Sequence, residues 1–336
     1  MFLGTRAHGE VIPPFLAAIE RAGDGMPALV ARALACTGSV IAIVRGMFSR
    51  SQQQLARELC DRAVTVARRS GDPALLLHCL IDAAIVRLFD DDPAGAEAAV
   101  ADALALATDQ GDQRQLARAK QWLAYSWANG GTADLDLALD LHAEALDGLR
   151  RSGEIHELCL ALGNHTQLLR LGERGEVELM RQLMDEAAEL GEEFGFVWML
   201  PGVWVAQAKG LVDDGDLEPA EMVVRRALRL ARRTDQHALA DCLELMAMIG
   251  LARGEAAWAA EVTGTAQALR TNLREAAGEV STTQVPADIR RSAAHLQRLE
   301  SELGAERLGQ LLAKGARRSL EEACDLALRR PTKANP

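Results

Sequence analysis

Apolar and polar residues alternate along this chain as they do on amphipathic helices, and the alternation itself recurs about every 41 residues. Five segments carry an alanine and a second apolar residue, with the alanine eight residues before a glycine or aspartate. These five glycine or aspartate positions, which we call frame residues, lie 40, 42, 42 and 40 residues apart: Gly71, Gly111, Gly153, Gly195 and Asp235. A repeat of this length predicts an all-α solenoid of antiparallel helical hairpins.

Each repeat contains two helices, one ending at the frame residue (B helix) and one beginning just after it (A helix). The expected B helices are 52–69, 93–108, 135–151, 177–193 and 219–233. The expected A helices are 73–89, 114–128, 154–171, 197–212 and 237–253. Glycine at a frame position suits the left-handed residue that ends many helices, and Asp92-Pro93 is typical of a helix start.

The two ends of the chain depart from the period. We expect apolar N-terminal helices within 1–50, the repeat array over 51–273, a C-terminal helical cap over 274–330 and a disordered tail over 331–336. The N-terminal hairpin is apolar all round, so it either packs beneath residues 2–15 or forms an interface with an upstream domain or a partner, including a homodimer. The interface candidates are Val40, Ile41, Ile43 and Val44.

The A helices have two kinds of position. The fifth and eighth residues after each frame residue are apolar in every repeat, which indicates packing. The seventh, eleventh, fourteenth and eighteenth vary widely, and they form one stripe on the helix. This A-helix stripe is predicted to face a groove or solvent.

Aromatic and amide side chains on the A-helix stripe suit a peptide or a small ligand. The candidate groove residues are Arg118, Trp122, Tyr125, Asn129, Asn164, Gln167 and Lys209. The alternative is that the aromatic rings only fill gaps between alanine-rich helices, since just 4% of the chain is aromatic.

Composition narrows the class of function. The formal net charge of −11 argues against a general nucleic-acid surface, which needs a basic excess. The six cysteines are scattered without a CxxC pair, which favours buried thiols in a reducing cytoplasm. The most apolar stretch, 34–44, is too short to span a membrane, and the first ten residues do not resemble a signal peptide. We therefore expect a cytoplasmic protein without membrane partners.

Catalytic and metal-binding patterns are weak in this sequence. The run Asp90-Asp91-Asp92 resembles an aspartate-rich magnesium motif, but no second ligand cluster accompanies it, and an N-terminal helix cap explains it better. His156 and His165 lie nine residues apart and cannot form the i, i+4 pair of many zinc sites. We expect no metal, no cofactor and no enzymatic activity.

Five hairpins, each with this alanine phrase, resemble the tetratricopeptide superfamily, and the long period resembles its MalT-like subgroup. The segments 254–261, 266–270, 303–307 and 319–323 resemble the C-terminal repeat region of actinobacterial STAND-type LuxR and SARP regulators. The resemblance implies a right-handed superhelix whose A helices line a concave groove. It does not carry over ATPase or DNA-binding roles, because the sequence has no GxxxxGK[ST] loop and no recognisable helix-turn-helix.

The sequence therefore predicts a non-catalytic interaction or sensing module of a cytoplasmic, transcriptional regulatory system. Its groove would bind a peptide, a partner domain or a small effector. Two alternatives stay open: an enzyme or biosynthetic accessory protein with a ligand site around Trp122 and Asn164, and an assembly scaffold.

Overall fold

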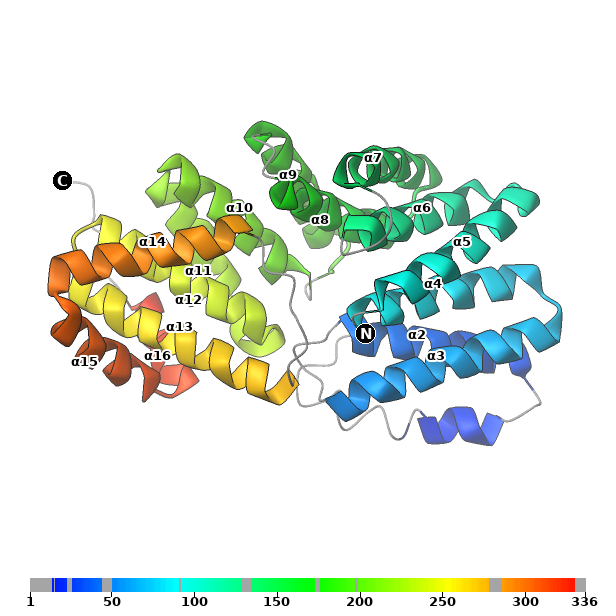
Figure 1. The fold of residues 1–336 in the computed structure, drawn as a ribbon, viewed down its shortest axis with the longest axis horizontal. Coiled ribbons are helices and arrows are strands. Elements are labelled where there is room, and N and C mark those ends of the chain that lie inside the picture. The colour runs from blue at the N-terminus through cyan, green and yellow to red at the C-terminus, as the bar shows by residue number, and fades with distance from the viewer. Residues whose placement is uncertain are drawn as a thin grey trace. The chain divides into compact units, whose positions relative to one another are not determined.

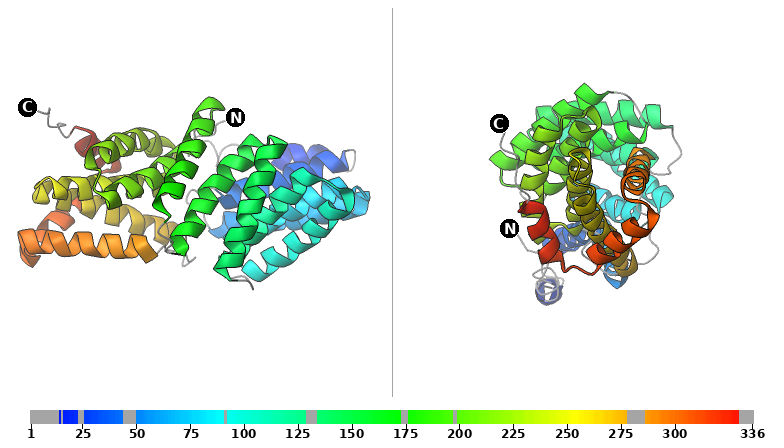
Figure 2. Two further views of the ribbon diagram at one scale, coloured as in Figure 1. Left: turned by 90° about the horizontal axis from the view of Figure 1, so that it is seen from above. Right: turned by 90° about the vertical axis from the view of Figure 1, so that its left-hand side faces the viewer.

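The computed structural model describes residues 14, 16–22, 26–43, 50–90, 92–128, 134–172, 176–196, 199–277 and 286–329, and within them all regular structure is helical (Figure 1). Two further views show the same helices from above and from one end (Figure 2). After a short helical segment at 16–22, the helices are α2 Pro27–Ile43, α3 Arg50–Ser70, α4 Pro73–Phe89, α5 Pro93–Gln110, α6 Gln113–Ala128, α7 Leu135–Ser152, α8 Ile155–Leu171, α9 Val177–Glu193, α10 Leu200–Asp214, α11 Leu217–Thr234, α12 Gln236–Ala252, α13 Ala256–Ala277, α14 Pro286–Leu303, α15 Ala305–Ala316 and α16 Leu320–Leu328.

The chain divides into two compact units. Unit 1 comprises Met1–Glu176 and Ala276–Thr283, and unit 2 comprises Val177–Glu275 and Gln284–Pro336. The division between α8 and α9 falls inside the predicted repeat array. Each unit is described below by itself.

Helical hairpins build both units, as the sequence predicts. In unit 1, α2, α4, α6 and α8 pack against one another in succession and against the intervening α3, α5 and α7. In unit 2, α10 packs against α12, and α11 packs against both. The A helices, with α2 beside α4, thus form one layer in unit 1, and α10 and α12 form one in unit 2, with the B helices packed against each layer.

The frame residues end their helices as predicted. Four of the five are glycines with φ between 65° and 72°, a left-handed conformation that costs glycine little: Gly71, Gly111, Gly153 and Gly195. Asp235 instead has an extended backbone, and its carboxylate accepts hydrogen bonds from the amides of His237 and Ala238 at 2.9 and 3.0 Å, so it caps α12. The alanines eight residues before the frames are at most 2% exposed, which lets neighbouring helices approach closely.

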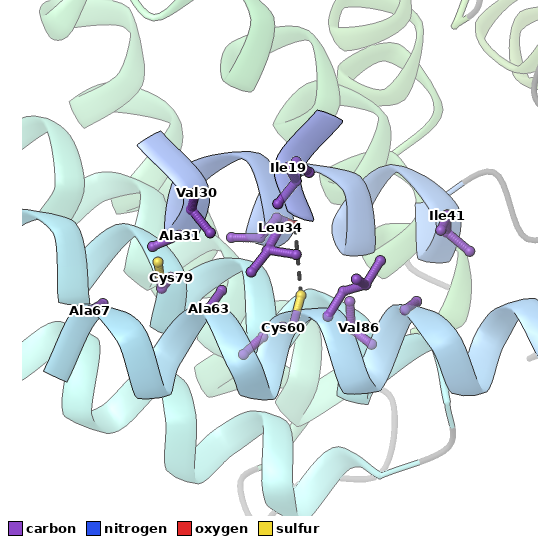
Figure 3. Close-up of a cluster of buried hydrophobic side chains, with 14 of the residues drawn as sticks. Ile19, Val30, Ala31, Leu34, Ile41, Cys60, Ala63, Ala67, Cys79 and Val86 are labelled. Atoms are coloured by element: carbon purple, nitrogen blue, oxygen red, sulfur yellow. Dashed lines mark hydrogen bonds between the residues drawn. The ribbon is translucent and has the colours of Figure 1, made fainter. Parts of the chain in front are cut away.

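The N-terminal hairpin is part of the first layer of unit 1. Helix α2 packs against both α3 and α4, and its apolar side chains meet those of α3 and α4 in one cluster (Figure 3). Ile41 is fully buried in this cluster, so its assignment to an interface is wrong, because the neighbouring helices already cover it. Val40 is 46% exposed. The Ile43 side chain and Val44 lie outside the described residues.

The C-terminal helices cover the last hairpin of unit 2. Helix α16 packs against α11 and α12, and Thr265 Oγ1 on α13 donates a hydrogen bond to the Gly315 carbonyl of α15 at 2.8 Å. Ser319 and Glu322 form the capping box that begins α16. The tail at 331–336 lies outside the described residues.

The acidic run at 90–92 serves as a helix start. Asp92 Oδ1 accepts a hydrogen bond from the Gly95 amide at 2.9 Å, and Arg57 pairs with Asp90 at 3.0 Å and with Asp92 at 3.2 Å. The capping interpretation is confirmed for Asp92, and Asp91 lies outside the described residues. Among the helices of the described chain, none combines the length and the apolar character needed to cross a membrane.

A pair of histidines is buried between α7 and α8. The His142 and His165 ring centroids are 5.2 Å apart, and the side chains are 0% and 6% exposed. Burial, together with the neighbouring His165, lowers the pKa of His142 to about 3. Burial and the charge of Arg150 lower the pKa of His165 to about 4. Both rings are therefore neutral in the folded protein at neutral pH.

Unit 1 should lose stability as the pH falls from about 6.5 towards 4, because the unfolded chain takes up protons on these histidines before the folded chain does. The stabilisation from the two neutral histidines is complete above about pH 6.5, the pKa of a histidine in the unfolded chain. It is lost as the pH falls from there towards the pKa values of the folded protein. We expect the loss to reach several kcal/mol. Urea unfolding at a series of pH values measures it. His142→Leu should flatten the slope between pH 5 and 6.5, and an unchanged slope would contradict the assignment.

Candidate functional site

The A-helix stripe of unit 1 carries a connected set of polar side chains. It crosses three neighbouring A helices, α4, α6 and α8, which pack side by side. Its members on α4 are His78 and Asp82, and α6 contributes Arg118. Facing them on α2 is Cys36, which no part of the predicted stripe included.

Arg118 is the centre of this set. Its Nε donates to Glu157 Oε1 at 2.8 Å, and its Nη2 donates to Asp82 Oδ1 at 2.8 Å. The side chains of Arg118 and Glu157 are each 12% exposed, and that of Asp82 is 2% exposed. Burial alone would lower the pKa of Arg118, but the Glu157 and Asp82 carboxylates raise it above its ordinary value. The guanidinium therefore stays charged and ties three A helices together.

His78 is a neutral imidazole between Arg118 and Asp82. Arg118 Nη1 lies 3.1 Å from His78 Nδ1, and a guanidinium can only donate, so Nδ1 accepts and the ring proton sits on Nε2. Nε2 lies 3.4 Å from Asp82 Oδ2 and 3.6 Å from Cys36 Sγ. Burial lowers the pKa of His78, an effect that Asp82 opposes.

Cys36 is an exposed thiol rather than an activated nucleophile. Although the residue is exposed as a whole, partial burial of the thiol and the nearby Asp82 carboxylate raise the pKa of Cys36 to about 11. A catalytic cysteine needs a lowered pKa and a basic partner, and His78 offers Cys36 a protonated nitrogen instead. This geometry does not favour thiolate catalysis.

The predicted aromatic members of the stripe are packed inward. Trp122 is 2% exposed and Tyr125 is 6% exposed, with their rings edge to face at 6.0 Å. Tyr125 Oη donates a hydrogen bond to Gln167 Oε1 on α8 at 3.1 Å, and burial raises the pKa of Tyr125 to about 12. A ligand therefore cannot stack on either ring in this conformation. Asn129 lies outside the described residues.

Several polar atoms along the stripe lack hydrogen-bond partners among the described residues. They include two donors, Trp122 Nε1 and Asn164 Nδ2, and the carboxylate oxygen Asp82 Oδ2; Glu157 Oε2, which lies beside the stripe on α8, also lacks a partner among these residues. Buried polar groups in folded proteins are nearly always paired, so such a concentration is unusual. Asn164 and Gln167 are half-buried, so their side chains stay within reach of the surface.

Lys209 belongs to unit 2 and has a different environment. Its Nζ contacts Asp241 of α12 at 2.7 Å and Asp288 of α14 at 2.9 Å. Arg291 of α14 also pairs with Asp213 of α10, so the stripe of unit 2 is covered by α14 (Figure 1). The structure thus places Lys209 in an internal ion-pair network.

A depression lies elsewhere on unit 1, among α3, α4 and α5. Its rim carries Asp61, Arg68, Arg87 and Asp102, and Arg87 pairs with Asp61 at 2.9 Å. These charges largely satisfy one another, so the stripe is the better candidate site.

Comparisons with known proteins concern the fold. No protein-family model matches the chain, and a search of curated proteins finds no match. The structure is similar to BtubC (BKLC) from P. vanneervenii, with a TM-score of 0.54 and 18% identity over 68% of this chain and 94% of that one. It is also similar to a Rap protein complexed with competence and sporulation factor, with a TM-score of 0.60 and 14% identity over 92% of this chain and 81% of that one. The fold is therefore a tetratricopeptide-like helical repeat.

Proposed function

We propose that this chain is a non-catalytic interaction module whose A-helix stripe in unit 1 binds an extended segment of a partner. The observation that carries the proposal is the pair of half-buried amide side chains on that stripe, Asn164 and Gln167, which lie within reach of the surface. An extended peptide presents alternating N–H and C=O groups, which can pair with both the oxygen and the nitrogen of a side-chain amide. A hydrogen bond to each of these amides contributes about 0.5–1.5 kcal/mol to the binding free energy.

The comparison with the Rap protein supports a role in binding, since that structure holds the protein together with a factor. The resemblance of the C-terminal segments to STAND-type regulators favours a place in a cytoplasmic transcriptional system. Partner binding would then alter the packing between successive hairpins and so relay a signal. A homodimer through the exposed part of α2, which includes Val40, is an additional proposal.

Asn164 provides the sharpest test of this binding surface. Display of random 12-residue peptides against the full chain should enrich a family of binders, whose affinity fluorescence anisotropy then measures. Asn164→Ala should weaken these binders about tenfold, because a lost hydrogen bond costs roughly 1–2 kcal/mol. Gln113→Ala, which alters an exposed amide at the start of α6, is the matched control and should bind as the wild type does.

Two outcomes count against the proposal. Failure to enrich any peptide would argue against a peptide-binding stripe. Equal affinities for wild type and Asn164→Ala would place the binding surface elsewhere.

A further inference from the structure

Three potential metal ligands converge at the edge of the stripe. They are Cys36 Sγ from α2 and the pair His78 Nε2 and Asp82 Oδ2, which lie one turn apart on α4. Within the described part of the chain, this is the one group of three such side chains whose ligand atoms lie within 4.8 Å of one another. We propose that these three side chains bind a tetrahedral divalent transition metal, with Zn²⁺ as the best-matched ion.

The separations match the edges of a zinc tetrahedron. Zinc binds nitrogen and oxygen at about 2.0–2.2 Å and sulfur at about 2.3 Å, so tetrahedral angles put nitrogen and oxygen ligands about 3.4 Å apart. The same geometry puts nitrogen and sulfur ligands about 3.6 Å apart. The His78 to Asp82 separation is 3.4 Å, and the His78 to Cys36 separation is 3.6 Å.

Burial and hydrogen bonding also suit a metal. Asp82 is 1% exposed, and the oxygen that would bind the ion lies 3.4 Å from His78 Nε2, a contact that the ion would replace. Its other oxygen is held by Arg118 Nη2 at 2.8 Å, which is the outer support that ligating carboxylates commonly have. Cys36 is exposed, so solvent reaches the edge of the site and water can supply a fourth ligand.

Charge balance selects the ion class. A thiolate and a carboxylate neutralise a divalent cation, and the separate Arg118 to Glu157 pair is already neutral. The mixed sulfur, nitrogen and oxygen ligand set favours Zn²⁺ or Co²⁺ over Mg²⁺ or Ca²⁺, which prefer oxygen. On binding, the Cys36 thiol releases its proton to solvent, and the His78 ring proton moves from Nε2 to Nδ1.

The proton movement has a consequence for Arg118. Nδ1–H and Arg118 Nη1–H are then two donors that were 3.1 Å apart, so the guanidinium edge has to turn away from His78 while its two carboxylate contacts remain. Metal binding should therefore switch the His78 tautomer, which ¹⁵N NMR of the imidazole reports directly. An ion bound elsewhere on the acidic surface would leave that tautomer unchanged.

The experiment is a titration of the full reduced chain with CoCl2, followed by displacement with ZnCl2. We expect one Co²⁺ per chain, the visible bands of tetrahedral cobalt and a near-ultraviolet thiolate band. Cys36→Ser should remove the thiolate band, and His78→Gln should weaken binding by more than about tenfold, since loss of a direct ligand costs at least as much as loss of an outer-shell partner. Cys324→Ser and His237→Gln, both in unit 2, are the matched controls and should bind as the wild type does.

Circular dichroism of each variant checks that the helices are retained. The proposal is overturned if folded Cys36→Ser shows the same cobalt spectrum as the wild type. It is also overturned if cobalt binds only with an octahedral spectrum, or if His78 keeps its proton on Nε2 in the presence of Zn²⁺. Peptide binding is measured separately, so a failure here leaves the proposed function standing.

Discussion

Replacing Arg118 by methionine should lower the free energy of unfolding of unit 1 by about 3–5 kcal/mol. The guanidinium sits between two carboxylates that are 2% and 12% exposed, and its loss leaves both charges without their partner. Methionine fills much of the same volume, so the effect reports the lost charge rather than a cavity. Urea unfolding followed by circular dichroism measures the change.

Arg87→Met is the matched control for this variant. Arg87 pairs with Asp61, whose side chain is 52% exposed, and exposed pairs contribute about 0–1 kcal/mol. We expect the control to unfold almost as the wild type does. A loss below about 1 kcal/mol for Arg118→Met would show that the buried network does not stabilise unit 1.

Trp122→Ala alone should lower the free energy of unfolding of unit 1 by about 3–5 kcal/mol. The indole is 2% exposed and packs edge to face against Tyr125, so its removal leaves a cavity between α6 and its neighbours. The size of this effect makes Trp122→Ala a poor test of ligand binding, because loss of binding could then follow from unfolding. Thermal unfolding followed by circular dichroism measures it.

Leu137→Ala is the control for Trp122→Ala. Leu137 lies on α7 of the same unit and is 55% exposed, so we expect a change within about 0.5 kcal/mol. Equal melting temperatures for Trp122→Ala and the wild type would mean that the ring is not packed as described.

The helical hairpins were predictable because their signals are local. The alanines that let helices approach, the left-handed glycines and the Asp92 cap each act within one or two turns of the chain. The repeat period of about 41 residues then follows from the distances along the chain between the frame residues. The division into two units has no such local signal, because it depends on how well successive hairpins pack.

The candidate site was predictable only in part. Arg118, His78 and Asp82 all occupy stripe positions, but the sequence did not predict that they contact one another, and Glu157 lies at a different frame position and was missed. The contact between Arg118 and Glu157 depends on how far one hairpin is rotated relative to the next. The spacing of residues along the chain does not give that rotation. The spacing of four residues between His78 and Asp82 places both side chains on one face of α4, and it is the one sequence signal for the metal site that we propose.

Other misses also come from tertiary packing. Cys36 lies on α2, a helix placed outside the predicted array, so its approach to His78 could not be foreseen. Trp122 occupies a stripe position, yet a ring of that size is buried between helices rather than displayed. Lys209 is covered by α14, and the repeat period contains no information on where a non-repeat helix docks.

Hydrogen–deuterium exchange of the full chain, with and without a peptide enriched by display, tests the binding surface itself. The account predicts slower exchange in α4, α6 and α8 when the peptide is bound, with α3, α5 and α7 unchanged. Protection confined to the B helices, or to unit 2 alone, would contradict it.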